Sequence, residues 1–170
     1  MRSTAAHPAP GVIRPGAELL IREITPADRR ALAFVLGHLS NSSRYLRFFG
    51  TALDTREEIE RLIDVDHWHH EALIAYSPPP RAPIAVVEYV RLERFDVADL
   101  AIAVTDDWQG QGVGRALLEV LRGRALAAGV RRFSASMLAS NRAALALARR
   151  FGAVSARESR GELIELVLEL

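Results

Sequence analysis

The sequence contains no cysteine and no lysine, so all 22 of its basic residues are arginine. The absence of cysteine excludes a disulfide framework, a thiolate nucleophile and a cysteine-ligated metal site. The chain also lacks the run of about 20 apolar residues that a membrane-spanning helix needs. Its formal net charge of +1 gives no general attraction to nucleic acid or to an anionic membrane. We therefore expect a small molecule or a protein as partner, no nucleic acid and no membrane, and a cytoplasmic location.

The length and composition predict one globular domain. A chain of 170 residues with 49% hydrophobic residues is long enough to bury a core but short for two domains. Residues 1–17 combine prolines and glycines without an apolar run, so they are predicted to form a flexible tail rather than a signal peptide. The predicted domain therefore covers residues 18–170.

Hydrophobic periodicity predicts alternating strands and helices along this domain. The predicted strands cover residues 18–24, 71–76, 83–92, 97–105, 131–137, 153–157 and 163–168. The predicted helices cover residues 25–39, 41–49, 55–63, 112–128 and 141–151. Thr55 and Glu58 have the spacing of a capping box, which predicts that the third helix begins at Thr55. The order of elements indicates an α/β fold with a mixed sheet.

Three glycines lie within five residues in AVTDDWQGQGVGRALLEVL, residues 103–121. They connect the end of a predicted strand to the start of an amphipathic helix. A helix start carries unpaired N–H groups and the positive end of the helix dipole. Residues without a Cβ atom let an anion approach those donors closely. The pattern therefore predicts a phosphate-binding loop, and it holds more glycines than a simple connecting turn requires.

Two common phosphate-binding loops are excluded by the details of this segment. A Walker loop needs Lys followed by Ser or Thr after its last glycine, where this chain has Arg115 and Ala116, and a dinucleotide fold needs G-x-G-x-x-G. The segment Gln109-Gly110-Gln111-Gly112-Val113-Gly114 resembles instead the acetyl-CoA pyrophosphate loop of the GNAT superfamily of N-acetyltransferases.

The resemblance to the GNAT superfamily extends from about Leu19 to Leu168. It implies a single GNAT-like domain, with a central mixed, twisted sheet of about six to seven strands flanked by helices. It also implies acetyl-CoA as cosubstrate, no metal, and a backbone N–H near Val104 that polarises the thioester carbonyl. The implied cofactor-binding residues are Val104, Gln109, Gly110, Gln111, Gly112, Val113, Gly114, Arg115 and Asn141.

Further segments are similar to the catalytic domain of bacterial Pat-type protein lysine acetyltransferases. These segments are SRYLRFF at residues 43–49, VDH at 65–67 and ALIA at 72–75. The similarity implies a protein lysine as the acetyl acceptor. A small amine is the alternative acceptor, and a non-catalytic acyl-CoA-binding sensor is the alternative to an enzyme. The sequence does not decide whether Arg44 and Arg47 in SRYLRFF are surface charges or binding residues.

Acetyl transfer to an amine requires a base, because a lysine amine with a pKa of about 10.4 is protonated near neutrality. Asp99 shares one face of its predicted strand with Ala101 and Ala103, whose small side chains leave a slot. Asp99 also lies ten residues before Gln109, similar to the position of the catalytic glutamate in related GNAT enzymes. Aspartate is one methylene shorter, so a bridging water is an alternative to direct proton transfer.

Glu88 is the second candidate base. It shares a strand face with Ile84, Val86 and Val90, and apolar neighbours are predicted to raise the pKa of its carboxyl. For Glu88 and Asp99 alike, the alternative is a structural ion pair with an arginine, and Asp99 is the favoured base.

The acid that many GNAT enzymes use is missing from this sequence. In those enzymes a tyrosine on the helix that corresponds to residues 141–151 protonates the leaving thiolate, and the matching position here is Ala148. Tyr45, Tyr76, Tyr89 and solvent remain as alternative acids.

The segment DVDHWHH, residues 64–70, contains several potential metal ligands. In an extended segment His67 and His69 point one way and His70 the other, and no further ligand follows at metal-site spacing. We therefore predict no metal site, but a loop that caps the preceding helix or borders the acceptor groove.

The absence of lysine has two interpretations. Genome base composition is the simpler one, because alanine is abundant and only two asparagines occur. Alternatively, an enzyme that acetylates lysine cannot modify its own side chains if it has none.

Overall fold

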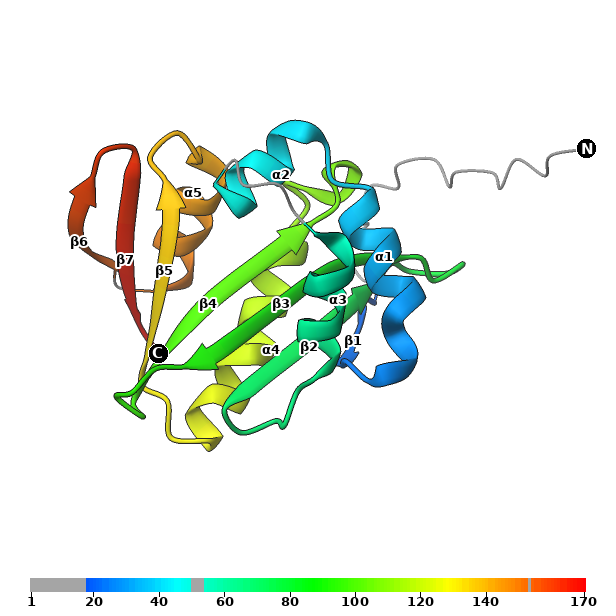
Figure 1. Cartoon of the computed structure of the whole chain (residues 1–170), viewed down its shortest axis with the longest axis horizontal. Helices are drawn as coiled ribbons and strands as arrows, with labels where there is room; N and C mark the ends of the chain where they lie inside the picture. Colours follow the sequence, from blue (N-terminus) through cyan, green and yellow to red (C-terminus); the bar gives the residue numbers. More distant parts are fainter. Residues whose placement is uncertain (1–17, 50–53, 153) are drawn as a thin grey trace, which may run out of the picture.

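The computed structural model describes residues 18–49, 54–152 and 154–170 (Figure 1). The tail predicted over residues 1–17 lies outside the described residues. The strands are β1 (Leu20–Glu23), β2 (His70–Tyr76), β3 (Pro83–Arg91), β4 (Val97–Val104), β5 (Arg132–Leu138), β6 (Val154–Arg160) and β7 (Leu163–Glu169). The α-helices are α1 (Arg29–Gly37), α2 (Asn41–Phe48), α3 (Thr55–Ile63), α4 (Val113–Ala127) and α5 (Arg142–Phe151).

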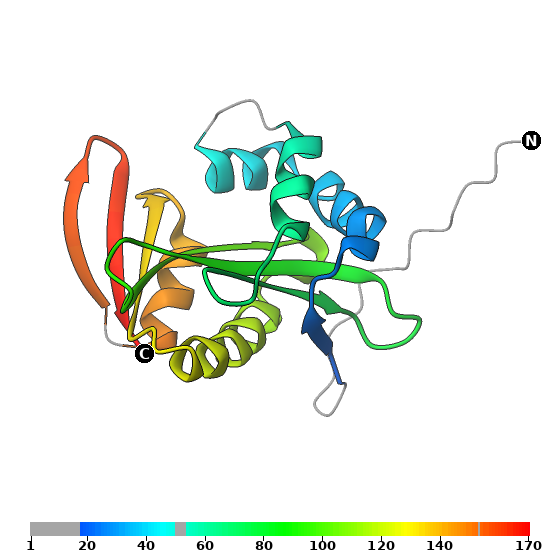
Figure 2. The ribbon, with the colours of Figure 1, turned by 60° about the horizontal axis from the view of Figure 1, so that its bottom comes forward.

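The strands form one mixed, seven-stranded sheet in the order β1-β2-β3-β4-β5-β7-β6. Helices α1, α2 and α3 lie on one face of this sheet, and α4 and α5 lie on the other (Figure 2). This arrangement agrees with the fold class and the strand number that the sequence predicts. The predicted element boundaries differ from the observed ones by three residues at most, except at the start of α1, because residues 26–28 form a separate 3₁₀ helix before α1 begins at Arg29.

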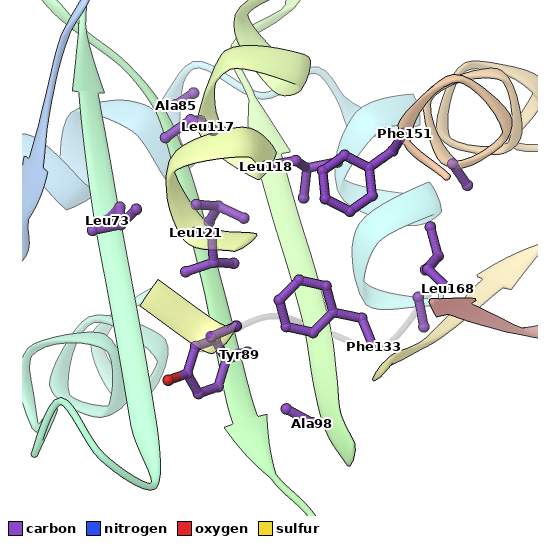
Figure 3. Close-up of a cluster of buried hydrophobic side chains, with 14 of the residues drawn as sticks. Leu73, Ala85, Tyr89, Ala98, Leu117, Leu118, Leu121, Phe133, Phe151 and Leu168 are labelled. Atoms are coloured by element: carbon purple, nitrogen blue, oxygen red, sulfur yellow. The ribbon is translucent and has the colours of Figure 1, made fainter. Parts of the chain in front are cut away.

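Two hydrophobic cores fill the space between the sheet and its helices. The larger core lies under α4 and α5, where Leu117 and Leu121 contact the sheet beside Tyr89 and Phe133 (Figure 3). The smaller core lies under α1 and α3 and is built by Ile24, Leu32, Val35, Leu36, Ile59, Leu62, Ile74 and Val86. Strands β2 and β3 are buried on both faces because each face is covered by a helix layer.

The neighbouring strands β4 and β5 separate along their length. They pair in parallel only where Val97–Asp99 lies against Arg132–Ser134. Beyond this short ladder the two strands diverge, while β4 stays paired with β3 and β5 with β7 (Figure 1). The sheet therefore opens at its centre, with α2 close to the wide end of the opening.

Helix α3 begins at Thr55 as predicted, but its N-cap differs from the prediction. The capping box predicted at Thr55 and Glu58 is wrong, because the carboxylate of Asp54 accepts hydrogen bonds from the N–H groups of Arg56 at 2.9 Å and Glu57 at 3.2 Å. Asp54 is therefore the N-cap, and it satisfies two donors of the first turn. The side chain of Glu58 binds Arg61 instead.

Candidate active site

The glycine-rich loop between β4 and α4 uses its glycines for two different reasons. Gly110 and Gly112 have φ angles of +71° and +87°, which residues with a Cβ atom rarely adopt. Gly114 lies in the first turn of α4, where a Cβ atom would come within 3.0 Å of Leu147 on α5 and 3.5 Å of Ile102 on β4. The first two glycines shape the loop, and the third lets α4 and α5 approach closely.

The two glutamines of this loop stabilise its shape. The Gln109 amide donates to the carbonyl oxygen of Val104 at 3.0 Å and to the hydroxyl of Ser43 at 3.2 Å. The Gln111 amide donates to the carbonyl oxygen of Asp107 at 2.7 Å. Helix α4 begins at Val113, so the N–H groups of its first turn have no intrahelical acceptor. The loop thus presents backbone donors at a helix N-terminus, as an anion site requires.

A cavity of about 500 Å³ lies between this loop, the diverging end of β4, and helices α2 and α5. Most of the predicted cofactor-binding residues line it, namely Val104, Gln109, Gly110, Gly112, Gly114, Arg115 and Asn141. Gln111 instead braces the loop, and the side chain of Val113 is buried in the core. Asn141 also caps α5, because its side-chain oxygen accepts the N–H of Ala144 at 3.0 Å.

Helix α2 also contributes to the cavity, and the sequence prediction missed this. Ser43, Leu46 and Arg47 from the segment SRYLRFF line its wall, and so does Arg150 of α5. A cavity of this size is typical of small-molecule sites. The resemblance of SRYLRFF to Pat-type enzymes was the one signal for these side chains, and their place in the cavity wall follows from the packing of α2 over the sheet.

A second cavity of about 130 Å³ shares lining residues with the first and lies at the gap between β4 and β5. Its wall includes Asp99 and Ala101 from β4, Ser136 and Met137 from β5, and Ala148 from α5. Asp99 therefore lies beside the opening at the centre of the sheet. The slot predicted next to Asp99 coincides with this cavity.

The surroundings of Asp99 raise the pKa of its carboxyl. Desolvation by the surrounding protein is the main cause, even though the side chain opens into the cavity. The positive charge of Arg47 opposes this increase, whereas the negative charges of Glu88 and Glu165 add to it. A raised pKa makes a carboxylate a stronger base, provided that it is ionised at the working pH.

Glu88 has the opposite environment, so the prediction that its pKa is raised is wrong. Its carboxylate is buried, and desolvation acts to raise the pKa. Hydrogen bonds from His70 at 2.8 Å and from both terminal nitrogens of Arg61 at 2.6 Å outweigh this effect and lower the pKa to about 2. Arg47 adds a contact at 3.2 Å. The carboxylate of Glu88 is therefore ionised, and its oxygens already accept hydrogen bonds from His70, Arg61 and Arg47. This favours Asp99 as the base.

The histidine-rich segment forms a turn beside this cluster. The carboxylate of Asp66 accepts hydrogen bonds from the backbone N–H groups of Trp68, His69 and His70 at 2.7–3.0 Å. Among the described residues, no group of three or more His, Cys, Asp or Glu side chains is arranged to hold a metal ion. In the same part of the chain, no helix is long and apolar enough to cross a membrane.

None of the three tyrosines, all of them within the described residues, lines either cavity. Tyr89 lies in the core under α4, on the opposite face of the sheet from Glu88 (Figure 3). Tyr76 binds Arg22 and Asp28, and Tyr45 is exposed on α2. Ala148, at the position where many GNAT enzymes have their tyrosine, lies in the wall of the smaller cavity. The geometry thus offers no tyrosine as the acid.

The chain is similar in sequence and in structure to known acetyltransferases. The chain is 32% identical over 155 residues to the acetyltransferase Pat of Mycolicibacterium smegmatis, covering 91% of this chain and 46% of that protein. This chain therefore spans about half the length of that relative. The GNAT domain of S. lividans PAT superposes with a TM-score of 0.84 at 29% identity, covering 94% of this chain and 95% of that domain.

A more distant structure shares the fold alone. PaiA N-acetyltransferase from Thermoplasma acidophilum, solved in complex with coenzyme A, has a TM-score of 0.71 at 13% identity over 90% of this chain and 99% of that one. The family model described as the acetyltransferase (GNAT) family matches residues 42–153, which include the glycine-rich loop and Asp99. This chain therefore belongs to the acetyltransferase (GNAT) family.

Proposed function

We propose that this chain transfers the acetyl group of acetyl-CoA to the side-chain amine of a protein lysine, with Asp99 as the general base. One observation carries the proposal: two adjoining cavities with shared lining residues extend from the glycine-rich loop, with its backbone N–H groups, to the carboxylate of Asp99. An acetyl donor with phosphate groups at one end and a reactive thioester at the other fits these cavities.

The phosphate end of acetyl-CoA would bind at the start of α4. The N–H groups of its first turn and the helix dipole favour a diphosphate there. Arg115 and Arg150 lie in the wall of the same cavity and supply positive charge. The pantetheine arm would then follow the gap between β4 and β5 toward Asp99.

The divergence of β4 and β5 supplies a donor for the thioester carbonyl. Thr105 donates its N–H to Ile84 at 2.9 Å and Val97 accepts from Leu92 at 3.0 Å, so the odd-numbered residues of β4 bind β3. Because hydrogen bonding alternates along an antiparallel strand, the backbone groups of Ile102 and Val104 point toward β5. The strands have separated at this level, and these N–H groups can polarise the carbonyl.

The reaction begins with an ammonium group. Asp99 takes one proton from it, directly or through a water molecule, and the nitrogen lone pair attacks the thioester carbonyl. The C–N bond forms, the C–S bond breaks, and CoA leaves as a thiolate. The nitrogen loses its second proton to solvent.

Support for a protein acceptor comes from the similarity to Pat proteins, together with the position of SRYLRFF. Leu46, Arg47 and Phe49 of that segment line the smaller cavity beside Asp99. The segment that resembles Pat enzymes therefore borders the reactive end of the opening.

The test measures CoA release by the purified protein with acetyl-CoA and a panel of lysine-bearing proteins, peptides and small amines. Turnover with protein lysines supports the proposal, and selective turnover with a small amine overturns its acceptor class. Tight acetyl-CoA binding without turnover on any acceptor overturns catalysis and favours an acyl-CoA sensor.

A further inference from the structure

The two cavities meet at a wall that contains a single charged side chain. The residues that line both cavities are Leu46, Arg47, Ile102, Ala144 and Leu147. Four of these side chains are apolar, and Arg47 is the exception. An acetyl donor that reaches from the glycine-rich loop to Asp99 passes the residues that both cavities share, and so passes Arg47, whose positive charge also acts on the Asp99 carboxyl.

The position of Arg47 is fixed by acidic residues from two other elements. Its guanidinium lies 3.2 Å from Glu88 on β3 and 3.7 Å from Glu58 on α3. Glu88 is itself held by Arg61 and His70, at 2.6 Å and 2.8 Å. The side chain is also largely shielded, with 23% of its surface exposed. Such a guanidinium is pre-organised and carries a permanent charge.

The chemistry needs a positive group at this junction. When the C–S bond breaks, both bonding electrons leave with sulfur, and a thiolate forms in a partly enclosed site. No tyrosine lies in the wall of either cavity to protonate it, and Ala148 has no polar side chain. Charge stabilisation by a fixed cation replaces proton donation without any further proton transfer.

We propose that Arg47 stabilises the negative charge of the leaving CoA sulfur, and that Glu88 is a positioning residue that holds Arg47 in place. This inference rests on the proposed acetyl transfer. In this inference neither Arg47 nor Glu88 acts as a base. The sulfur keeps its electron pair as a thiolate beside Arg47 and takes a proton from solvent only on release.

The first experiment requires no turnover. The thiol of bound CoA is titrated by following the ultraviolet absorbance of its thiolate, in the wild-type protein and in Arg47→Gln. A cation within a few ångströms of the sulfur lowers the pKa of the bound thiol, so Arg47→Gln should raise it by about one pH unit or more. Equal titration of bound CoA in both proteins would overturn the inference.

The second experiment measures acetyl transfer. Arg47→Gln is expected to lower kcat by about 10²-fold with little change in the KM for acetyl-CoA. Arg47→Lys keeps the charge and should recover part of the loss. Arg44→Gln is the matched control: it removes a cation from the same helix, where Arg44 binds the carbonyl oxygen of Leu36 at 2.9 Å and lines neither cavity. Its kcat and its bound-CoA titration should match the wild type.

The two proposals fail in different ways. A wild-type protein that turns over no amine contradicts the proposed function, whatever the titration gives. A wild-type protein that is active, with Arg47→Gln folded and equally active, contradicts only the role of Arg47. Should Arg47→Gln not fold, the wild-type protein alone supplies the titration: a pKa of the bound CoA thiol below that of free CoA supports the inference, and one equal to or above it overturns the inference.

Discussion

Asp99 and Glu88 lie on the adjacent strands β4 and β3 with their carboxylates on the same face of the sheet, yet their surroundings are opposite. Glu88 receives hydrogen bonds from His70 and Arg61 and contacts Arg47. Asp99 has no such partner among the described residues and opens into the cavity beside the separated strands. The pKa of Glu88 is therefore lowered and that of Asp99 raised. Burial alone does not make a carboxylate a base; the number of donors it receives decides.

The largest effect should come from exchanging the two carboxylates for amides. Asp99→Asn removes the proposed base, so kcat/KM should fall by about 10²–10⁴-fold. Glu88→Gln keeps a hydrogen-bonding side chain beside Arg47, and its loss should be about tenfold. Steady-state kinetics with the acceptor that the CoA-release assay identifies measures both losses. A Glu88→Gln loss as large as that of Asp99→Asn would reverse the assignment.

The next effect concerns stability and has opposite signs for the two residues. Because the pKa of Glu88 is lowered from its ordinary 4.5 to about 2, its ionised form stabilises the fold by about 3 kcal/mol. That contribution is complete above the ordinary pKa and is lost as the pH falls through about 2. Asp99 has a raised pKa, so its ionisation opposes folding at neutral pH.

Urea denaturation at pH 7 measures the free energy of unfolding of variants at both residues. Glu88→Gln should lower the free energy of unfolding by about 3 kcal/mol, whereas Asp99→Asn should raise it by a smaller amount. Glu60→Gln is the control, because Glu60 is on α3 like Glu58 but forms an exposed pair with Arg29. Its effect should be small, because an exposed ion pair contributes little to stability. A destabilising Asp99→Asn would mean that Asp99 has a structural partner.

The smallest effect is a shift in the pH profile. The acidic limb of kcat/KM should follow the ionisation of Asp99, which is influenced by Arg47 on α2, Arg61 on α3, Glu88 on β3 and Glu165 on β7. Removing the negative charge of Glu88 should lower the pKa of Asp99 and move this limb to lower pH. A pH series of kcat/KM for Glu88→Gln and wild type measures it, and a limb that moves to higher pH contradicts the proposed coupling.

The local features of the fold were predictable because short-range physics determines them. The glycine-rich loop, the alternation of Asp99 with Ala101 along β4, and the helix that starts near Val113 all follow from spacing along the chain. The N-cap of α3 was predicted one residue too late, because Asp54 and Thr55 are both good capping residues and only backbone geometry distinguishes them.

The partners of Glu88 were not predictable in the same way. Val86 and Val90 on its strand face indicated an apolar environment, but Arg47 and Arg61 reach it from other elements. These contacts join residues 27 and 41 positions apart in the sequence. No periodicity within one element records such a contact.

By itself, the sequence determined the order of strands and helices and the identity of the family, and it predicted a phosphate-binding loop, because these depend on residue types at short fixed spacings. Only the tertiary structure decided that β4 and β5 separate beyond Asp99, that α2 places Arg47 at the junction of the two cavities, and that Glu88 is paired. The physical reason is that charge, desolvation and hydrogen bonding depend on distances in space, which packing between distant segments sets.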